Sequence, residues 1–262
     1  MSKDIRIKKG LDIKLIGDAE QTLAEVSVSG VYAIKPENFH GIIPKVLAKV
    51  GAEVKAGETL FYSKSDARIL FPSPVSGKVV EIIRGERRKV LEIRIEADAT
   101  QQFADFGKKE ASKMSAEEVK THLLSSGCWP FVKQRPYDVV ANPNQAPKSI
   151  FVSGYNSAPL AADLDYALKG KEAEIQEAIT ALGKLTEGKV HVSISKNSTL
   201  SPFKGVKGAE LHGLVGPHPV GNVSTQIAKL DPINKGEVIW VVTAQDLVVI
   251  GELLLTGKFN AK

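Results

Sequence analysis

The chain has 262 residues, of which 43% are hydrophobic and 25% are charged, so it can fold into a water-soluble protein with one or two domains. Its formal charge of +5 is small, and a glutamate interrupts the densest basic run, "RGERRK" (84–89). We therefore expect a solvated hairpin face there and no nucleic-acid partner. The single cysteine, Cys128, excludes an internal disulfide, an iron–sulfur cluster and a four-thiolate zinc site.

Membrane insertion is not expected. The N-terminus, "MSKDIRIKKG", is polar and lacks the apolar core of a secretory signal. The most apolar stretch (238–255) contains Gln245, Asp246 and Glu252, and it falls short of the roughly 20 apolar residues that a spanning helix needs. We predict a chain that is soluble in isolation but can dock on a membrane protein.

The first 97 residues have the pattern of short strands separated by glycines. Apolar residues alternate at Ile5 and Ile7, and two later segments each read as strand, glycine turn, strand, with Gly51 and Gly85 as the turn residues. Repeated strand–turn–strand units favour a small sandwich with approximate two-fold symmetry. We expect residues 1–99 to form this all-β domain.

Helical periodicity begins after a linker or short crossover at 96–113. Ser115 and Glu118 have capping-box spacing at the start of one helix, and Gly127 supplies its stop signal. Apolar strands then alternate with helical segments, which predicts an α/β fold with a mainly parallel, Rossmann-like sheet over residues 100–257. The predicted strands are 149–152, 190–195 and 237–242, and the predicted helices are 158–170, 171–188, 222–230 and one from Thr243 to about Gly257.

A proline- and glycine-marked hairpin carries the first resemblance to a known family. The pattern "VGAEVKAGETL" (50–60) followed by "PSPVSGKV" (72–79) resembles the biotinyl/lipoyl-like, or barrel-sandwich hybrid, family. In carriers of that family the modified lysine precedes the P-x-P-x-x-G run, but here Asp66 stands at that position and Lys64 comes two residues too early. Because a register shift moves a side chain off the tip, we expect a retained scaffold without carrier chemistry.

A second resemblance covers nearly the whole chain. The segments that carry it are 5–22, "SSGCWPFVKQRPYDVV" (125–140), 149–168, "ELHGLVGPHPVGNVSTQIAKLDPI" (210–233) and 245–258. They are similar to the A subunit of the Na⁺-translocating NADH:quinone oxidoreductase, the NqrA family. The resemblance implies a membrane complex that passes electrons from NADH to quinone and exports Na⁺. Family members continue well beyond residue 262, so we expect residues 258–262 to begin a truncated C-terminal region.

More distant relatives, the C subunit of the Rnf complex and the flavin-binding subunit of respiratory complex I, bind FMN with a G-R-G-G-A-G-F loop. Consecutive glycines let backbone amides approach the phosphate. The corresponding stretch here is "SSGCWPF" (125–131), with one glycine, two bulky residues and a proline. We predict no cofactor in this chain, and the resemblance places FAD, FMN and Fe–S centres on the other subunits.

Candidate contact residues are few. Trp129, Phe131 and Arg135 are candidates for lining a cleft or packing on a partner, although the two aromatic rings are also typical of a core. His212 and His218 flank a glycine-rich loop without an obvious carboxylate, so we expect loop histidines bonded to backbone and no metal site. We predict no catalytic residue, and name Trp129, Arg135, His212 and His218 as cleft or partner contacts.

The resulting functional hypothesis is a peripheral subunit bound to the cytoplasmic face of the bacterial inner membrane. Its partners are the other subunits of the complex, and its role is that of a scaffold or of a quinone-handling protein, with quinone as the substrate of the complex. Two alternatives stay open. One is an Rnf-type electron-transfer subunit that binds FMN or NADH, which a flavin-coloured protein would reveal. The other is a biotin or lipoate carrier module, which an adduct on Lys64 would reveal.

Overall fold

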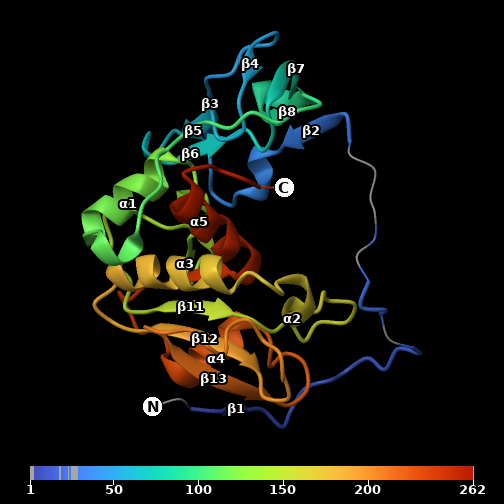
Figure 1. Cartoon of the computed structure of the whole chain (residues 1–262), viewed down its shortest axis with the longest axis vertical. Coiled ribbons are helices and arrows are strands. Elements are labelled where there is room, and N and C mark those ends of the chain that lie inside the picture. The colour runs from blue at the N-terminus through green and yellow to red at the C-terminus, as the bar shows by residue number, and fades with distance from the viewer. Residues whose placement is uncertain (1–2, 18, 23, 25–28, 262) are drawn as a thin grey trace.

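The computed structural model describes residues 3–17, 19–22, 24 and 29–261. A β-rich unit lies at one end of the molecule and an α/β unit at the other, with helices between them (Figure 1). Residues 1–2, which we assigned to the first domain, and Lys262, the last residue of the short terminal segment, lie outside the described residues.

The β-rich unit consists of two small antiparallel sheets packed face to face. Between them lie the side chains of Leu60, Phe61, Phe71, Val79 and Ile93, all with no exposed surface. This arrangement is the sandwich that the sequence predicts. Its four-stranded sheet has the order β2 (Val31–Ile34), β8 (Val90–Ala97), β7 (Gly77–Arg84), β4 (Glu53–Val54), and its three-stranded sheet has the order β3 (Pro44–Val46), β5 (Thr59–Ser63), β6 (Leu70–Pro72).

The expected equivalence of the two glycine turns is wrong. Gly51 has φ +89° and connects β3 to β4, which belong to different sheets. Gly85 is extended, with φ −97° and ψ −156°, and the β7–β8 turn is made instead by Arg87 and Arg88 at φ 53° and 61°. A sandwich needs one connection that crosses between its sheets and another that stays within one sheet, so similar sequence segments take different turns.

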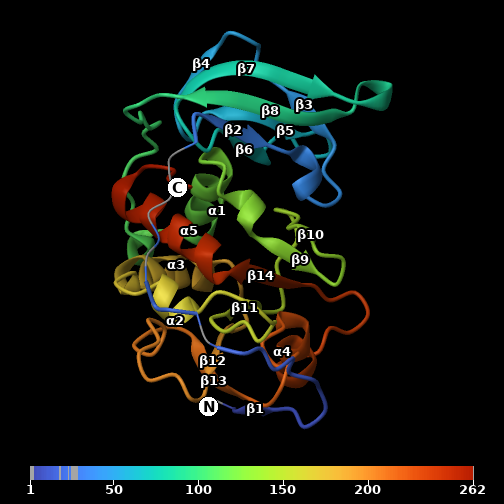
Figure 2. The same cartoon turned by 90° about the vertical axis from the view of Figure 1, so that its right-hand side faces the viewer.

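The α/β unit contains a seven-stranded, mainly parallel sheet, as predicted. The helices α1, α3 and α5 lie between this sheet and the β-rich unit, and α4 covers the opposite face (Figures 1 and 2). The sheet order is β1 (Ile5–Arg6), β13 (Glu210–Val215), β12 (Val190–Ser195), β11 (Ile150–Ser153), β14 (Ile239–Thr243), β9 (Lys133–Arg135), β10 (Val139–Val140). The helices are α1 (Ala116–Ser125), α2 (Leu164–Ala167), α3 (Glu172–Lys184), α4 (Val223–Leu230) and α5 (Ala244–Thr256).

The first strand falls within the predicted domain of residues 1–99 but pairs with the sheet of the other unit. β1 does not join the sandwich, because Ile5 pairs in parallel with Leu214 of β13 at the edge of the large sheet. Ile5 is 3% exposed and packs against Leu214 and Val220. Gly10 continues the contact, since a Cβ there would lie 2.1 Å from the backbone oxygen of His218. The chain therefore crosses the α/β unit before it reaches the sandwich.

Helix α1 begins with the predicted capping box. The Ser115 hydroxyl accepts from the Glu118 amide at 3.3 Å, and the Glu118 carboxylate accepts from the Ser115 amide at 2.7 Å. Gly127, with φ +76°, follows the last turn as expected. Both ends of this helix are thus set by residues that the local sequence identifies.

Replacing Ser115 with alanine is expected to lower the free energy of unfolding by about 1 kcal/mol, because one amide in the first turn loses its acceptor. Urea unfolding measures the change. Ser112→Ala is the control, since the Ser112 hydroxyl donates to the exposed Glu110 carboxylate and caps no helix. An equal effect of the two variants would show that the cap contributes nothing.

The two predicted helices after β11 have different outcomes. In α3, Ile175, Ile179 and Leu182 are completely buried, which confirms the apolar stripe. The predicted helix 158–170 is reduced to the four residues of α2. Asp163 caps α2 by accepting from the amides of two residues in its first turn, so the helix begins six residues later than expected.

The predicted linker 96–113 is held by both units. The Ala56 amide donates to the backbone carbonyl of Gln102, and the Ala104 amide donates to that of Ala56. The Phe106 amide donates to the backbone carbonyl of Gly257 in the α/β unit. Buried side chains of the two units form one contiguous hydrophobic cluster that runs from the sandwich into α3 and α5. Within the described residues, no helix is both long enough and apolar enough to cross a membrane.

Candidate functional site

Two motifs that lie far apart in sequence meet between the units. The Pro72 ring of the P-x-P-x-x-G run packs on Gly127, where a Cβ would lie only 2.6 Å from the proline Cδ. Gly127 is also in the left-handed region at φ +76°, so both its backbone and its surroundings favour glycine. A cleft of about 200 Å³ lies beside this contact, and both residues line it.

Aromatic rings form much of the cleft. Phe39 meets Phe71 edge to face with centroids 4.6 Å apart, and Phe131 stacks on Phe259 at 6.1 Å with an angle of 8° between the planes. These distances lie within the range in which aromatic pairs attract. Phe39 and Phe71 come from the β-rich unit, whereas Phe131 and Phe259 come from the α/β unit. The cleft therefore exists only when the two units are packed together.

Polar groups lie at the cleft and next to it. Lys35 and Asn38 belong to its lining, and the Lys35 ammonium pairs with Glu92 at 3.2 Å. Lys133 does not line the cleft, but its ammonium group lies 5.1 Å from the centroid of the Phe39 ring, which does. Burial lowers the pKa of Lys133, and the Asp246 and Asp138 carboxylates oppose that shift. An apolar slot with a few polar groups suits a flat ring that bears carbonyl oxygens.

The stretch 125–131 does not offer the amide nest of a phosphate-binding loop. The Gly127 amide donates to Leu124 at 3.3 Å, the Phe131 amide donates to Cys128 at 3.1 Å, and Pro130 has no amide hydrogen. Cys128 and Trp129 have no exposed surface. Burial raises the pKa of the Cys128 thiol to about 12, so this thiol is not reactive. The absence of a flavin from this chain stays a prediction.

A second hollow of about 370 Å³ lies at the carboxyl ends of β11 and β14. It marks a topological switch point, because the strands that follow β11 lie first on one side of it and then on the other. The helix caps Asn222 and Thr243 line it. The Asp246 carboxylate accepts from the Thr243 hydroxyl at 2.7 Å, and burial raises the pKa of Asp246. The Asp246 carboxyl group therefore already occupies the N-terminal end of α5, and its presence there disfavours binding of an anionic ligand.

None of the four predicted contact residues lines the aromatic cleft. Trp129 is completely buried, its indole nitrogen donates to the Ala141 carbonyl at 2.8 Å, and its ring meets Trp240 edge-on. Its prediction as a cleft or partner contact is therefore wrong, since bulk and one backbone acceptor place it in the core. Arg135 is partly exposed at the end of β9, where it donates to the Ser224 hydroxyl at 3.3 Å.

The two predicted histidines lie in different places in the fold. His218 lies in the loop after β13 and lines the second hollow, with its Nδ1 atom 3.0 Å from the Ser157 hydroxyl. His212 is a strand residue and is 1% exposed, so the prediction of a loop histidine in a cleft is wrong for it. The expected hydrogen bond to backbone is confirmed, because His212 Nδ1 lies within 3.1 Å of the Lys3 amide nitrogen and carbonyl oxygen. His212 lies beside His191, and Glu210 supplies the nearby carboxylate that we did not recognise.

The residues that shape the cleft were mostly missed. Phe131 was anticipated as a cleft residue, but Phe39, Phe71, Phe259 and Lys35 were not. They come from three segments, 35–39, 70–72 and 257–261, with no shared local motif, and no spacing rule connects these segments. The sequence contains one indirect signal for the cleft, namely Pro72 and Gly127. Prolines and glycines of this kind mark places where two segments can approach closely.

The carrier-like hairpin between β5 and β6 is bound to the α/β unit. The Arg68 guanidinium pairs with Asp66 at 2.6 Å and donates to the Asn144 side chain at 2.9 Å. This guanidinium lowers the pKa of Asp66, and the pair fixes the residue at the modified-lysine position. Lys64 remains exposed beside it. A hairpin tip that is hydrogen-bonded to the other unit does not suit a carrier domain, which must present its modified lysine freely to partner enzymes.

Comparison with known families matches residues 5–98 to the NqrA N-terminal barrel-sandwich hybrid domain and residues 114–259 to the NqrA second alpha/beta domain. Three similar proteins are each described as the A subunit of a Na(+)-translocating NADH-quinone reductase. The one from Yersinia pseudotuberculosis (serotype O:1b) is 34% identical over 97% of this chain and 57% of its own length. Those from Tolumonas auensis and Neisseria meningitidis are 35% and 32% identical, over 97% and 98% of this chain and 57% and 58% of their own lengths. The chain thus spans less than three-fifths of these relatives.

Proposed function

Because this chain belongs to the NqrA family, we propose that it acts as a peripheral, quinone-handling part of a Na⁺-translocating NADH:quinone reductase. It binds at the cytoplasmic face of the bacterial inner membrane through other subunits of that complex. FAD, FMN and Fe–S centres belong to those subunits. The chain itself has a scaffold role and no catalytic centre of its own.

The aromatic cleft is the observation that carries the quinone part of this proposal. A quinone head group is a flat, mostly apolar ring with two carbonyl oxygens. Phe131 and Phe39 provide ring faces and edges, and Lys35 and Asn38 provide donors in the same cleft. A volume of about 200 Å³ is smaller than the roughly 300 Å³ at which drug-sized sites begin, so it suits a ring and not a whole nucleotide cofactor.

The composition supports a role without an electron carrier in this chain. A lone buried thiol cannot hold an iron–sulfur cluster, and the Gly127 and Phe131 amides already donate to the Leu124 and Cys128 carbonyls. The chain then contributes by positioning the quinone, because its two units supply the two sides of the cleft. The hydrogen bond from Arg68 to Asn144 joins the β5–β6 hairpin to the α/β unit and helps to hold the two units together.

Phe131→Ala is expected to weaken the binding of a short-chain ubiquinone about tenfold, because a lost ring contact and its buried area are worth roughly 1.4 kcal/mol. Isothermal titration of the purified chain measures the dissociation constant. The matched control is Phe103→Ala, since Phe103 is also half-buried but contacts Lys258 outside the cleft lining.

Equal affinity of the Phe131 variant and the unaltered chain would contradict the cleft as the quinone site. Failure of the folded, unaltered chain to bind any quinone would contradict quinone handling by these residues. A purified chain with bound flavin would contradict the cofactor-free role, whichever result the titration gives.

A further inference from the structure

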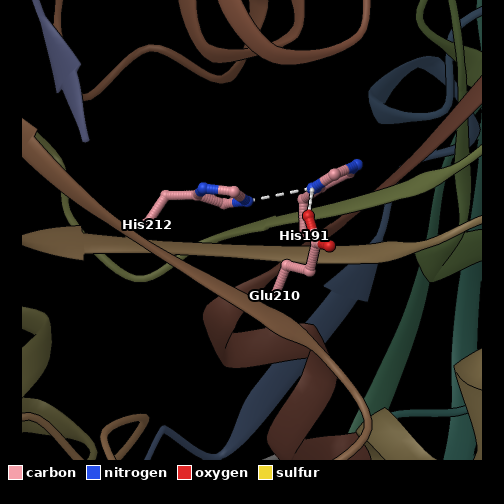
Figure 3. A group of neighbouring side chains, drawn as sticks. All are labelled: His191, Glu210 and His212. Carbon is pink, nitrogen blue, oxygen red and sulfur yellow. Dashed lines mark hydrogen bonds and ion pairs between the residues drawn. The ribbon is translucent and has the colours of Figure 1, made fainter. Parts of the chain in front are cut away.

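A second group of chemically active side chains lies on the other face of the large sheet, on the side that α4 covers. His191 is on β12, and Glu210 and His212 are on the neighbouring β13 (Figure 3). The parallel register places His191 beside Glu210 and Ser193 beside His212. Because alternate residues of a strand share a face, all four side chains lie on the same face of the sheet.

The ligand atoms converge. His191 Nδ1 lies 3.0 Å from His212 Nε2 and 3.8 Å from Glu210 Oε2 (Figure 3). One atom from each of the three residues can be chosen so that all lie within 4.8 Å of one another. Tetrahedral bonds of about 2.0–2.1 Å to zinc would separate such atoms by roughly 3.3 Å, so only small movements are needed.

Surrounding groups hold each ligand in place. His212 Nδ1 lies 3.1 Å from the Lys3 amide nitrogen and 3.0 Å from the Lys3 carbonyl oxygen, so the Lys3 backbone holds the ring in place. In the tautomer that donates to the carbonyl, the Nε2 lone pair faces His191. Metal-bound histidines usually have such a backbone acceptor on their other nitrogen. The second oxygen of Glu210 pairs with Lys189, and the His191 ring packs on Phe151 with centroids 4.6 Å apart.

Burial keeps both imidazoles in the form that binds metals. His191 and His212 are 6% and 1% exposed, and burial lowers the pKa of both, that of His191 to about 4. Beside them, the completely buried Ser193 hydroxyl has no hydrogen-bond partner among the described residues. Buried hydroxyls are normally bonded, so this one indicates a place where a water or an ion belongs.

We propose that His191, Glu210 and His212 form a Zn²⁺ site, with His191 Nδ1, His212 Nε2 and Glu210 Oε2 as its protein ligands. Two histidines and one carboxylate are an established ligand set for zinc, and three protein ligands leave the fourth position to water. The ion links the two strands that supply its ligands. It joins β12 to β13 and, through the backbone of Lys3, secures the segment that leads into β1.

Titration of the metal-free full chain, purified without a polyhistidine tag, with Zn²⁺ tests this assignment. Isothermal titration should give one ion per chain, and Co²⁺ in place of Zn²⁺ should give the visible absorption of a tetrahedral site. Glu210→Gln and His191→Asn should each weaken Zn²⁺ binding at least tenfold. His40→Asn is the matched control, because His40 is exposed and outside the cluster.

Circular dichroism in the presence of a chelator establishes that each variant is folded. If the folded Glu210→Gln protein binds Zn²⁺ as tightly as the unaltered chain, the proposal is wrong. It is also wrong if the folded, unaltered chain binds no Zn²⁺, since the two histidines would then be a hydrogen-bonded pair with a purely structural role. Neither result depends on quinone binding, which uses different residues.

Discussion

Replacing Trp129 with alanine is expected to lower the free energy of unfolding by about 3–5 kcal/mol, the usual cost of removing a large buried aromatic side chain. Trp129 has no exposed surface and lies edge-on to Trp240 with centroids 5.4 Å apart. Its removal leaves a cavity and also deprives the buried Ala141 carbonyl of the indole donor. Urea unfolding followed by circular dichroism measures the loss.

The matched control for this variant is Tyr137→Ala. Tyr137 is another aromatic residue of the same unit, but it is 76% exposed, so its removal should change stability by less than about 0.5 kcal/mol. A loss below about 1 kcal/mol for Trp129→Ala would mean that this side chain is not the core residue that its burial indicates.

Gly127→Ala is expected to cost about 2–4 kcal/mol. Part of the cost comes from placing an L-residue at φ +76°, and part from forcing a methyl group against Pro72, which would lie 2.6 Å away. Because Pro72 belongs to the β-rich unit, relief of this clash moves the two units apart. The variant should therefore also weaken binding of the short-chain ubiquinone at the adjacent cleft.

Gly170→Ala separates the two causes. Gly170 has φ +82°, but a Cβ added there would meet no atom within 4 Å, so only the backbone cost of about 1 kcal/mol applies. Unfolding in urea gives the stability of both variants. If Gly127→Ala and Gly170→Ala lose the same amount, the contact between Gly127 and Pro72 does not limit how closely the units pack.

The site shows how far local patterns reach. The sequence identifies the stretch 125–131 as the counterpart of a flavin-binding loop, and in the structure its Gly127 and Phe131 amides donate to nearby carbonyls. The same stretch supplies Phe131 to the cleft. Its partners Phe39, Phe71 and Phe259 could not be chosen in advance, because an aromatic residue in a short strand or loop packs equally well in a core.

The group of His191, Glu210 and His212 on the large sheet also could not be identified from local sequence patterns. Sequence alone gives His212 no ligand partner, although His191 and Glu210 complete the group. His191 lies in an alternating strand pattern that gives no sign of which strand will lie next to it. Only the parallel register of β12 and β13 places His191 beside Glu210. A one-residue shift would have turned His191 to the opposite face.

The amino-acid sequence by itself determined the ends of α1, the buried stripe of α3, the mainly parallel sheet, the sandwich and the family. These features depend on capping hydrogen bonds, apolar periodicity and motifs that act within a few residues. The tertiary structure alone decided that β1 joins the large sheet, that the cleft forms between two units, and that two histidines and a glutamate converge. The reason is physical: strand edges and side-chain faces do not specify their distant partners until packing selects one register and one interface.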